Sequence, residues 1–231
     1  MVNLKTRLDS PEIMDDFDLP AEEIIPVLKG LGKVNAIFGG HAAIINALKK
    51  FPIKSNYSIA DWGCGGGDTL IAIAKWADKN NFPLNFIGID ASPATVEFAR
   101  GQSSNYKNIR YVQADVLDDK VKINTCDIII CSLFTHHFDD AQWVQLINSM
   151  YQTAGKGIII TDLHRHWLLY YAVVLITKLT GNTMVQNDGP LSVQRSFKRR
   201  ELITLLFKTQ IDNFKLTWKW PFRWELTIYK P

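Results

Sequence analysis

Short apolar runs alternate with helix-like segments along the middle of this 231-residue chain, and this alternation limits the fold more than any other feature. We expect strands at Tyr57–Trp62, Leu84–Ile89, Ile109–Gln113, Cys126–Cys131 and Gly157–Asp162, and helices at Thr69–Lys79, Ala94–Arg100 and Ala141–Tyr151. Such alternation predicts a parallel sheet covered on both faces. The runs Ile128–Ile130 and Ile158–Ile160 are continuously apolar, which is typical of central strands.

The N-terminal part of the chain precedes this alternation. A helix is expected to open at Leu19–Glu23, where proline and acids fall in the first turn. A second helical stretch is expected at about Lys33–Lys50, interrupted by Gly39 and Gly40. We interpret residues 1–54 as a helical extension or lid on a single domain that spans residues 55–231.

Residues 163–197 break the alternation again. This segment begins with a helix rich in Trp, Tyr and Leu and continues as a predicted loop rich in Gly, Asn, Asp and Pro. A helix over Lys198–Thr209 and two strands then close the chain. We interpret about 163–197 as an insertion near the functional site.

Charge and cysteine content argue against several classes of protein. The net charge is only +3, and Lys198–Arg200 is the one tight basic run, which is typical of a solvated helix start rather than a nucleic-acid-binding surface. The three cysteines form no C-x-x-C pair. Cys126 and Cys131 are an odd number of residues apart on an expected strand, so we expect them to point to opposite faces. We expect neither a zinc centre nor a disulfide framework.

The sequence also bears on location. Residues 1–30 are acidic and lack an apolar core segment, so we expect no signal peptide and a cytoplasmic protein. The longest apolar stretch, Trp167–Ile176, is shorter than the roughly 20 residues that a spanning helix needs. Peripheral membrane contact through residues 167–180 stays an alternative.

A glycine-rich segment follows the first expected strand. It reads Asp61-Trp62-Gly63-Cys64-Gly65-Gly66-Gly67-Asp68, with glycines at alternate positions 63, 65 and 67. Glycine lets a backbone turn tightly and lie directly against a ligand. A dinucleotide fingerprint would place its third glycine at position 68, where the carboxylate of Asp68 is unfavourable for a pyrophosphate. The segment therefore favours a nucleoside without phosphates.

Acidic residues end the next two strands. Asp90 follows the second strand, roughly 20 residues beyond the glycines, where such folds bind both ribose hydroxyls. Asp115 follows the third strand on the same rim, within reach of an exocyclic amine on a purine. The alternative is that these Asp residues only cap helices.

Together these residues resemble class I S-adenosylmethionine-dependent methyltransferases over roughly residues 55–163. The resemblance implies an α/β fold with a doubly wound, mostly parallel seven-stranded sheet, and S-adenosyl-L-methionine as cofactor. It implies that Gly63 and Gly65 pack on the methionine part, that Asp61 serves its ammonium, and that Asp90 and Asp115 serve ribose and adenine. The expected cofactor-binding set is completed by Cys64, Ala91, Val116 and Ser132.

Four of the five histidines follow two central strands, at positions 136, 137, 164 and 166. Loops at these strand ends lie on the ligand-binding rim. Our candidates for a catalytic base are His136, His137 and His164; we expect the adjacent pair to point apart, with His136 inward. A metal site would need a further acidic or thiol set that the spacing does not offer, so no metal is expected.

The acceptor site is expected beside these histidines. Candidate substrate residues are Phe38, His41, Thr135, Arg165 and Tyr170, with Phe38 and His41 as a lid. Arg165 has a second interpretation, as the partner of a neighbouring carboxylate such as Asp162. Residues 167–176 either line an apolar pocket or pack against the core or a second subunit.

We therefore predict O-methylation of a small, apolar, aromatic hydroxyl compound, assisted by histidine, in a monomer or homodimer with no nucleic-acid partner. This prediction also draws on a resemblance to small-molecule methyltransferases of polyketide and aryl-lipid biosynthesis, in which a Thr-His-His follows the fourth strand. C- or N-methylation of a lipid-like or polyketide metabolite is the alternative within the family. A nicotinamide-dependent oxidoreductase, or a non-catalytic cofactor-binding or scaffold protein, is the alternative outside it.

Overall fold

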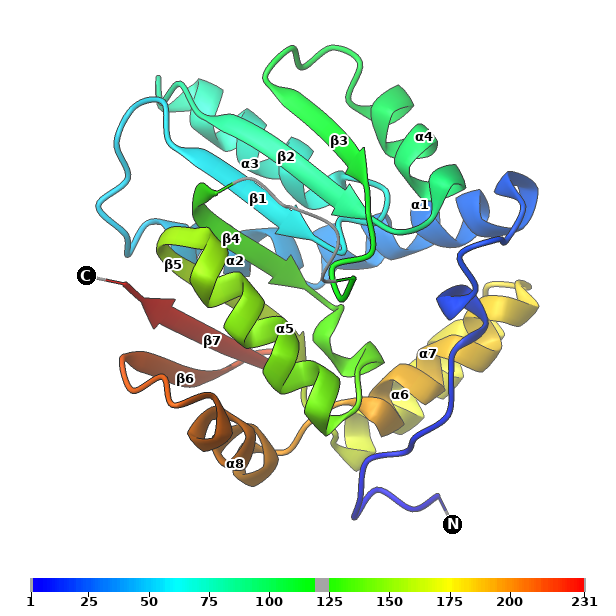
Figure 1. Ribbon diagram of the computed structural model, residues 1–231. Helices are drawn as coiled ribbons and strands as arrows, with labels where there is room; N and C mark the ends of the chain where they lie inside the picture. Colours follow the sequence, from blue (N-terminus) through cyan, green and yellow to red (C-terminus); the bar gives the residue numbers. More distant parts are fainter. Residues whose placement is uncertain (1, 119–124, 231) are drawn as a thin grey trace.

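The computed structural model describes residues 2–118 and 125–230, and these form a seven-stranded sheet with helices on both faces (Figure 1). The strands are β1 (Ser58–Trp62), β2 (Asn85–Asp90), β3 (Ile109–Gln113), β4 (Cys126–Ser132), β5 (Ala154–Leu163), β6 (Phe214–Lys219) and β7 (Arg223–Tyr229). Their order is β3-β2-β1-β4-β5-β7-β6. Strands β1 to β5 run parallel, and β7 is antiparallel to both of its neighbours. The expected doubly wound, mostly parallel sheet is confirmed.

Each face of the sheet has its own apolar core. Helices α2 (Gly40–Leu48), α3 (Asp68–Lys79) and α4 (Pro93–Gln102) pack on one face, with Ile128 and Ile130 of β4 beneath them. Helices α5 (Asp140–Thr153) and α8 (Arg199–Thr209) pack on the other face, over Ile129 and Cys131. Apolar side chains on both faces of β4 account for the continuous apolar run in its sequence.

The two N-terminal helices divide at a different place from the one predicted. Helix α1 runs through Ala21–Ile37, so the residues from Lys33 onward extend the first helix instead of opening the second. The break is at Gly39, whose φ of 71° lies in the left-handed region that glycine adopts at little cost. Helix α2 begins at the next residue, Gly40.

The predicted Gly/Asn/Asp/Pro loop is also wrong, because this segment forms helix α7 (Thr183–Arg195). The Asn182 side chain caps its first turn by accepting from the Val185 amide at 3.0 Å. Gly189 lets α7 approach α6 (Trp167–Lys178) closely, since a Cβ there would lie 2.8 Å from Thr177 Cγ2. Close packing between the two helices thus overrides the weak helix propensity of glycine.

Cys126 and Cys131 do not point to opposite faces as predicted, because both pack in the apolar core beneath α5 and α8. The register of β4 against β5 shifts between Cys126 and Ile128, as in a β-bulge. Here β4 advances two residues while β5 advances three, and regular alternation of the β4 side chains between the two faces begins only at Ile128.

The chain before α1 crosses α7 (Figure 1). It includes a short 3-10 helix, Ile13–Asp15, whose first two amides donate to the Asp188 carboxylate of α7 at 2.9 and 3.0 Å. We call residues Arg7–Asp16 the N-terminal strap. None of the helices in the described ranges is long and apolar enough to cross a membrane.

Candidate active site

The glycine-rich segment forms a turn between β1 and α3. Gly63, Gly65 and Gly67 have φ values of 69°, 50° and 76°, all in the left-handed region. The amides of Gly63 and Cys64 both donate to the Ile89 carbonyl, at 2.9 and 3.0 Å, which ties the turn to the end of β2. The Cys64 side chain is buried in the core, so only its backbone faces the turn.

A carboxylate without a partner lies at the end of β1. Asp61 is 2% exposed, and within the described ranges its Oδ1 atom has no hydrogen-bond partner. Burial, reinforced by the charges of Asp68 and Asp90, raises the pKa of this carboxyl well above its usual range. A buried carboxylate oxygen that lacks a donor fits an ammonium group brought in by a ligand.

Asp90 supports the glycine turn from the end of β2. Its Oδ2 atom accepts from the Gly65 amide at 3.0 Å, and its Oδ1 atom accepts from the Ser92 amide at 3.1 Å. Burial raises the pKa of Asp90, although these hydrogen bonds lower it. Each carboxylate oxygen can accept a second hydrogen bond, so ribose hydroxyls can still be bound here.

The remaining expected cofactor residues lie along the same sheet edge. Asp115 is exposed, and its Oδ1 atom accepts from the Leu117 amide at 2.9 Å. Val116 is buried, the Ala91 carbonyl accepts from Gln113, and the Ser132 hydroxyl lies 3.1 Å from the hydroxyl of Thr161. Asp61 and Asp90 are close enough for the charge of Asp90 to raise the pKa of Asp61. Asp115 lies on the solvent-exposed side of the same edge.

An aromatic side chain lies against the glycine turn. A Cβ at Gly63 would come within 2.3 Å of Phe134 Cγ, so the space beside Gly63 belongs to this ring. Phe134 also makes an edge-to-face contact with Phe138, with ring centroids 4.9 Å apart. The role of Gly63 toward a methionine chain stays a prediction.

His136 lies on the loop after β4 and points inward. It is 2% exposed, and its Nδ1 atom lies 2.7 Å from Asp162 Oδ1 at the end of β5. The other carboxylate oxygen accepts from the Thr135 hydroxyl at 2.6 Å and from the His136 amide at 3.0 Å. Burial alone would raise the pKa of Asp162, but the charge of His136 and these hydrogen bonds lower it to about 2.

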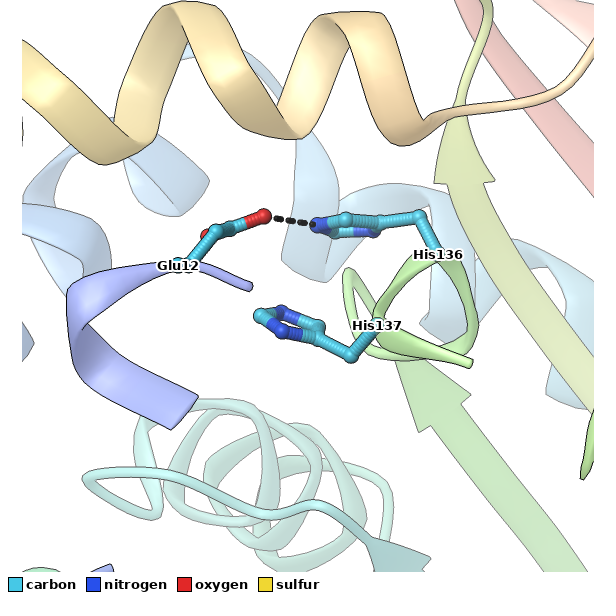
Figure 2. Close-up of side chains that lie close together, drawn as sticks. All are labelled: Glu12, His136 and His137. Atoms are coloured by element: carbon cyan, nitrogen blue, oxygen red, sulfur yellow. Dashed lines mark ion pairs between the residues drawn. The ribbon is translucent and has the colours of Figure 1, made fainter. Parts of the chain in front are cut away.

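His137 does not point away from His136 as predicted. The two ring centroids are 4.4 Å apart, and both rings lie beside Glu12 of the N-terminal strap (Figure 2). The His137 Nδ1 atom lies 2.5 Å from Asp15 Oδ1, and Arg195 of α7 pairs with the other oxygen of Asp15 at 2.7 Å. Asp162 of β5 and Asp15 of the strap thus hold the two rings on the same side.

Glu12 and Asp15 were missed by the sequence analysis. Both lie more than a hundred residues from the histidines, and the strap has no sequence period that reveals its path. The one sequence feature that pointed to them is the excess of acidic residues in the segment before α1. Burial raises the pKa of Glu12 to about 7.

His164 and Arg165 lie in a different environment from the adjacent histidines His136 and His137. His164 Nδ1 accepts from Trp218 Nε1 at 3.2 Å, and burial lowers the pKa of His164 to about 4. Arg165 is 1% exposed and pairs with Glu201, rather than with Asp162 as suggested. Its guanidinium also donates to the carbonyls of Leu4, Lys5 and Ser196. These contacts make Arg165 a structural residue rather than one that binds substrate.

The other predicted substrate residues are spread over several elements. His41 pairs with Asp68 through Nε2 and Oδ2 at 2.5 Å, and Phe38 ends α1 with its side chain partly exposed. Thr135 holds Asp162, and Tyr170 lies on α6. Packing of α6 against the core is not observed, because within that helix only Thr177 is buried.

A family model described as a methyltransferase domain matches residues 59–157. Uncharacterized methyltransferase YcgJ of Bacillus subtilis (strain 168) is 27% identical over 97 residues, which is 41% of this chain and 36% of that protein. The match thus spans about a third of the length of the curated relative.

Two solved structures illustrate the shared fold. A SAM-dependent methyltransferase from Aquifex aeolicus has a TM-score of 0.59 at 15% identity, over 80% of this chain and 87% of that one. Human N-acetylserotonin methyltransferase, solved with SAM, has a TM-score of 0.62 at 17% identity, over 95% of this chain and 62% of that one. At these identities the likeness concerns the fold.

The strand order, the turn between β1 and α3 and the family match define one class of protein. Residues 59–157 match a methyltransferase domain, and the fold is that of S-adenosylmethionine-dependent methyltransferases. The matched segment holds Asp61, the glycine turn, Asp90 and both central histidines. The N-terminal strap and the α6–α7 pair lie outside the matched segment.

Proposed function

We propose that this protein transfers the methyl group of S-adenosylmethionine to the hydroxyl oxygen of a small aromatic acceptor. The observation that carries the cofactor assignment is the buried Oδ1 atom of Asp61, which has no partner among the described residues, beside a glycine turn that Asp90 holds in place. The cofactor contributes an electrophilic methyl group on a positively charged sulfur. Asp61 would hold its ammonium group, and Asp90 would accept hydrogen bonds from its two ribose hydroxyls.

The acceptor needs a group that takes its proton. Phenols have a pKa near 10 and stay protonated at neutral pH. When bound, the cofactor would supply its sulfonium methyl group to the acceptor oxygen and leave as a neutral thioether. Nε2 of His136 would take the hydroxyl proton. Asp162 supports this transfer because it holds Nδ1 at 2.7 Å and stabilises the imidazolium that forms.

Aromatic side chains near the histidines support an aromatic acceptor. Phe134 lies between the glycine turn and the histidines, with its ring centroid 6.0 Å from that of His137. Phe138 contacts the same ring edge-to-face. Rings of this kind favour offset or edge-to-face contacts with an aromatic ligand.

Replacing Asp90 with alanine is expected to weaken binding of S-adenosylhomocysteine by about 1–3 kcal/mol, because ribose hydroxyls lose their acceptor. Part of this loss reflects the Gly65 amide, which also loses its partner. Isothermal titration calorimetry measures the change, with the exposed carboxylate variant Asp78→Ala as control. Unchanged affinity in Asp90→Ala would contradict the assigned role.

The function itself is tested with a labelled methyl donor and a panel of phenols, compared with matched amines and acidic carbon compounds. We expect label in phenol ethers and release of S-adenosylhomocysteine. Melting shifts with S-adenosylhomocysteine but not with NADH are expected as well. A shift with NADH alone would exclude methyl transfer, and label only in amines or carbon acids would exclude a hydroxyl acceptor.

A further inference from the structure

Three side chains that could bind a metal converge under the N-terminal strap. Glu12, His136 and His137 each offer one ligand atom, and the three atoms lie within 4.8 Å of one another (Figure 2). Glu12 is 4% exposed, and within the described ranges its Oε1 atom has no hydrogen-bond donor. The second carboxylate oxygen accepts from the Ser192 hydroxyl at 2.9 Å, which fixes the side chain.

Both imidazoles are oriented as metal ligands are. Asp162 lies 2.7 Å from Nδ1 of His136, and Asp15 lies 2.5 Å from Nδ1 of His137. A carboxylate that accepts the Nδ1 proton leaves Nε2 with a free lone pair and makes it more basic. Carboxylate–histidine pairs of this kind are common in the outer shell of zinc sites.

The spacing between His136 and Glu12 fits two ligands of one ion. His136 Nε2 and Glu12 Oε1 are 3.7 Å apart, too far for a hydrogen bond. Two ligands at about 2.0–2.2 Å from a tetrahedral zinc lie roughly 3.3–3.6 Å from each other. A small adjustment of either side chain therefore brings both atoms to bonding distance of a shared cation.

We propose that Glu12, His136 and His137 bind a divalent first-row transition-metal ion such as Zn²⁺. Two imidazoles and one carboxylate suit zinc, cobalt or iron rather than magnesium, which prefers oxygen ligands. Three protein ligands leave a further position for water or another oxygen, as in catalytic zinc sites. The sequence analysis expected no metal because the acidic ligand comes from the distant strap.

This site shares His136 with the proposed methyl transfer. One lone pair on Nε2 takes either a proton or a cation, so the metal-bound protein cannot use this nitrogen as a base. The two proposals therefore need separate measurements. Metal binding is measured without cofactor or acceptor, and methyl transfer is measured with a chelator present.

The test titrates chelator-treated protein with Zn²⁺, Co²⁺ and Mg²⁺ by calorimetry, and records the visible absorption of the Co²⁺ form. We expect one Zn²⁺ or Co²⁺ per chain and no binding of Mg²⁺. Glu12→Gln and His137→Gln should each weaken Zn²⁺ binding by about 100-fold or more, since even an outer-shell change costs 10- to 100-fold. Both variants should also change the Co²⁺ spectrum.

Matched controls are Glu22→Gln, an exposed carboxylate at the start of α1, and His166→Gln, in the other histidine cluster. Circular dichroism of the metal-free variants shows whether each one folds, and two ligand variants keep the test valid if one does not. Absent binding of Zn²⁺ and Co²⁺ would overturn the proposal. So would binding that survives in both ligand variants or is lost in His166→Gln. Metal binding without methyl transfer would overturn only the proposed function.

Discussion

Asp61→Asn is expected to abolish most of the affinity for S-adenosylmethionine and S-adenosylhomocysteine. Removing one member of a buried charge pair costs about 2–5 kcal/mol, which is roughly 30-fold to several thousandfold in Kd. The amide keeps the shape of the side chain but cannot neutralise the ligand's ammonium. Titration calorimetry with S-adenosylhomocysteine measures the loss, and Asp78→Asn, an exposed site on α3, is the matched control.

The same substitution is expected to stabilise the ligand-free protein. Burial holds the folded-state pKa of Asp61 well above the ordinary range of a carboxyl, so its ionisation opposes folding. The stability associated with this group is present below about pH 4 and is lost as pH rises through the folded pKa. Asp61→Asn should therefore raise the melting temperature at neutral pH but not at pH 4. A lower melting temperature at neutral pH, or unchanged ligand affinity, would contradict the assignment of Asp61.

His136→Ala is expected to lower kcat with a phenol acceptor by roughly 100-fold or more, with little change in cofactor affinity. General-base catalysis contributes about 10²–10⁴-fold, and no other imidazole pairs with Asp162 in the described ranges. Turnover in the presence of a chelator and calorimetry with S-adenosylhomocysteine separate the two effects. Removing the ring leaves Asp162 buried without its partner, so melting temperatures are recorded alongside.

The matched comparison replaces other histidines. His166→Ala, in the cluster beside Trp167 and Phe222, is expected to retain turnover. His137→Ala should cost less than His136→Ala, because its Nδ1 is held by the strap rather than by β5. Equal losses in both adjacent histidine variants would assign the proton transfer to the pair instead of to His136.

The sheet could be predicted from sequence because each strand carries its own local signal. Ile128–Ile130 and Ile158–Ile160 are apolar on both faces, and the alternate glycines after Asp61 mark a turn in which three residues adopt positive φ. Parallel strands bring their carboxyl ends to one edge whatever the loops do. Asp61 and Asp90 therefore lie together as the strand pattern requires.

The rest of the site depends on contacts that no local pattern records. Glu12 reaches the histidines because Asp188 and Ser192 of α7 hold the strap, and α7 itself was predicted as a loop. The adjacent histidines share one side only because Asp162 and Asp15 orient each ring separately. Arg165 seemed available for a substrate, yet backbone carbonyls far along the chain engage its guanidinium.

A crystal structure of the complex with S-adenosylhomocysteine tests the central claim most directly. We expect the ligand's ammonium within hydrogen-bonding distance of Asp61 Oδ1 and both ribose hydroxyls at Asp90. We expect the glycine turn to lie against the part of the ligand that joins these two groups. A ligand bound elsewhere, or bound here with its ammonium turned away from Asp61, would contradict this claim.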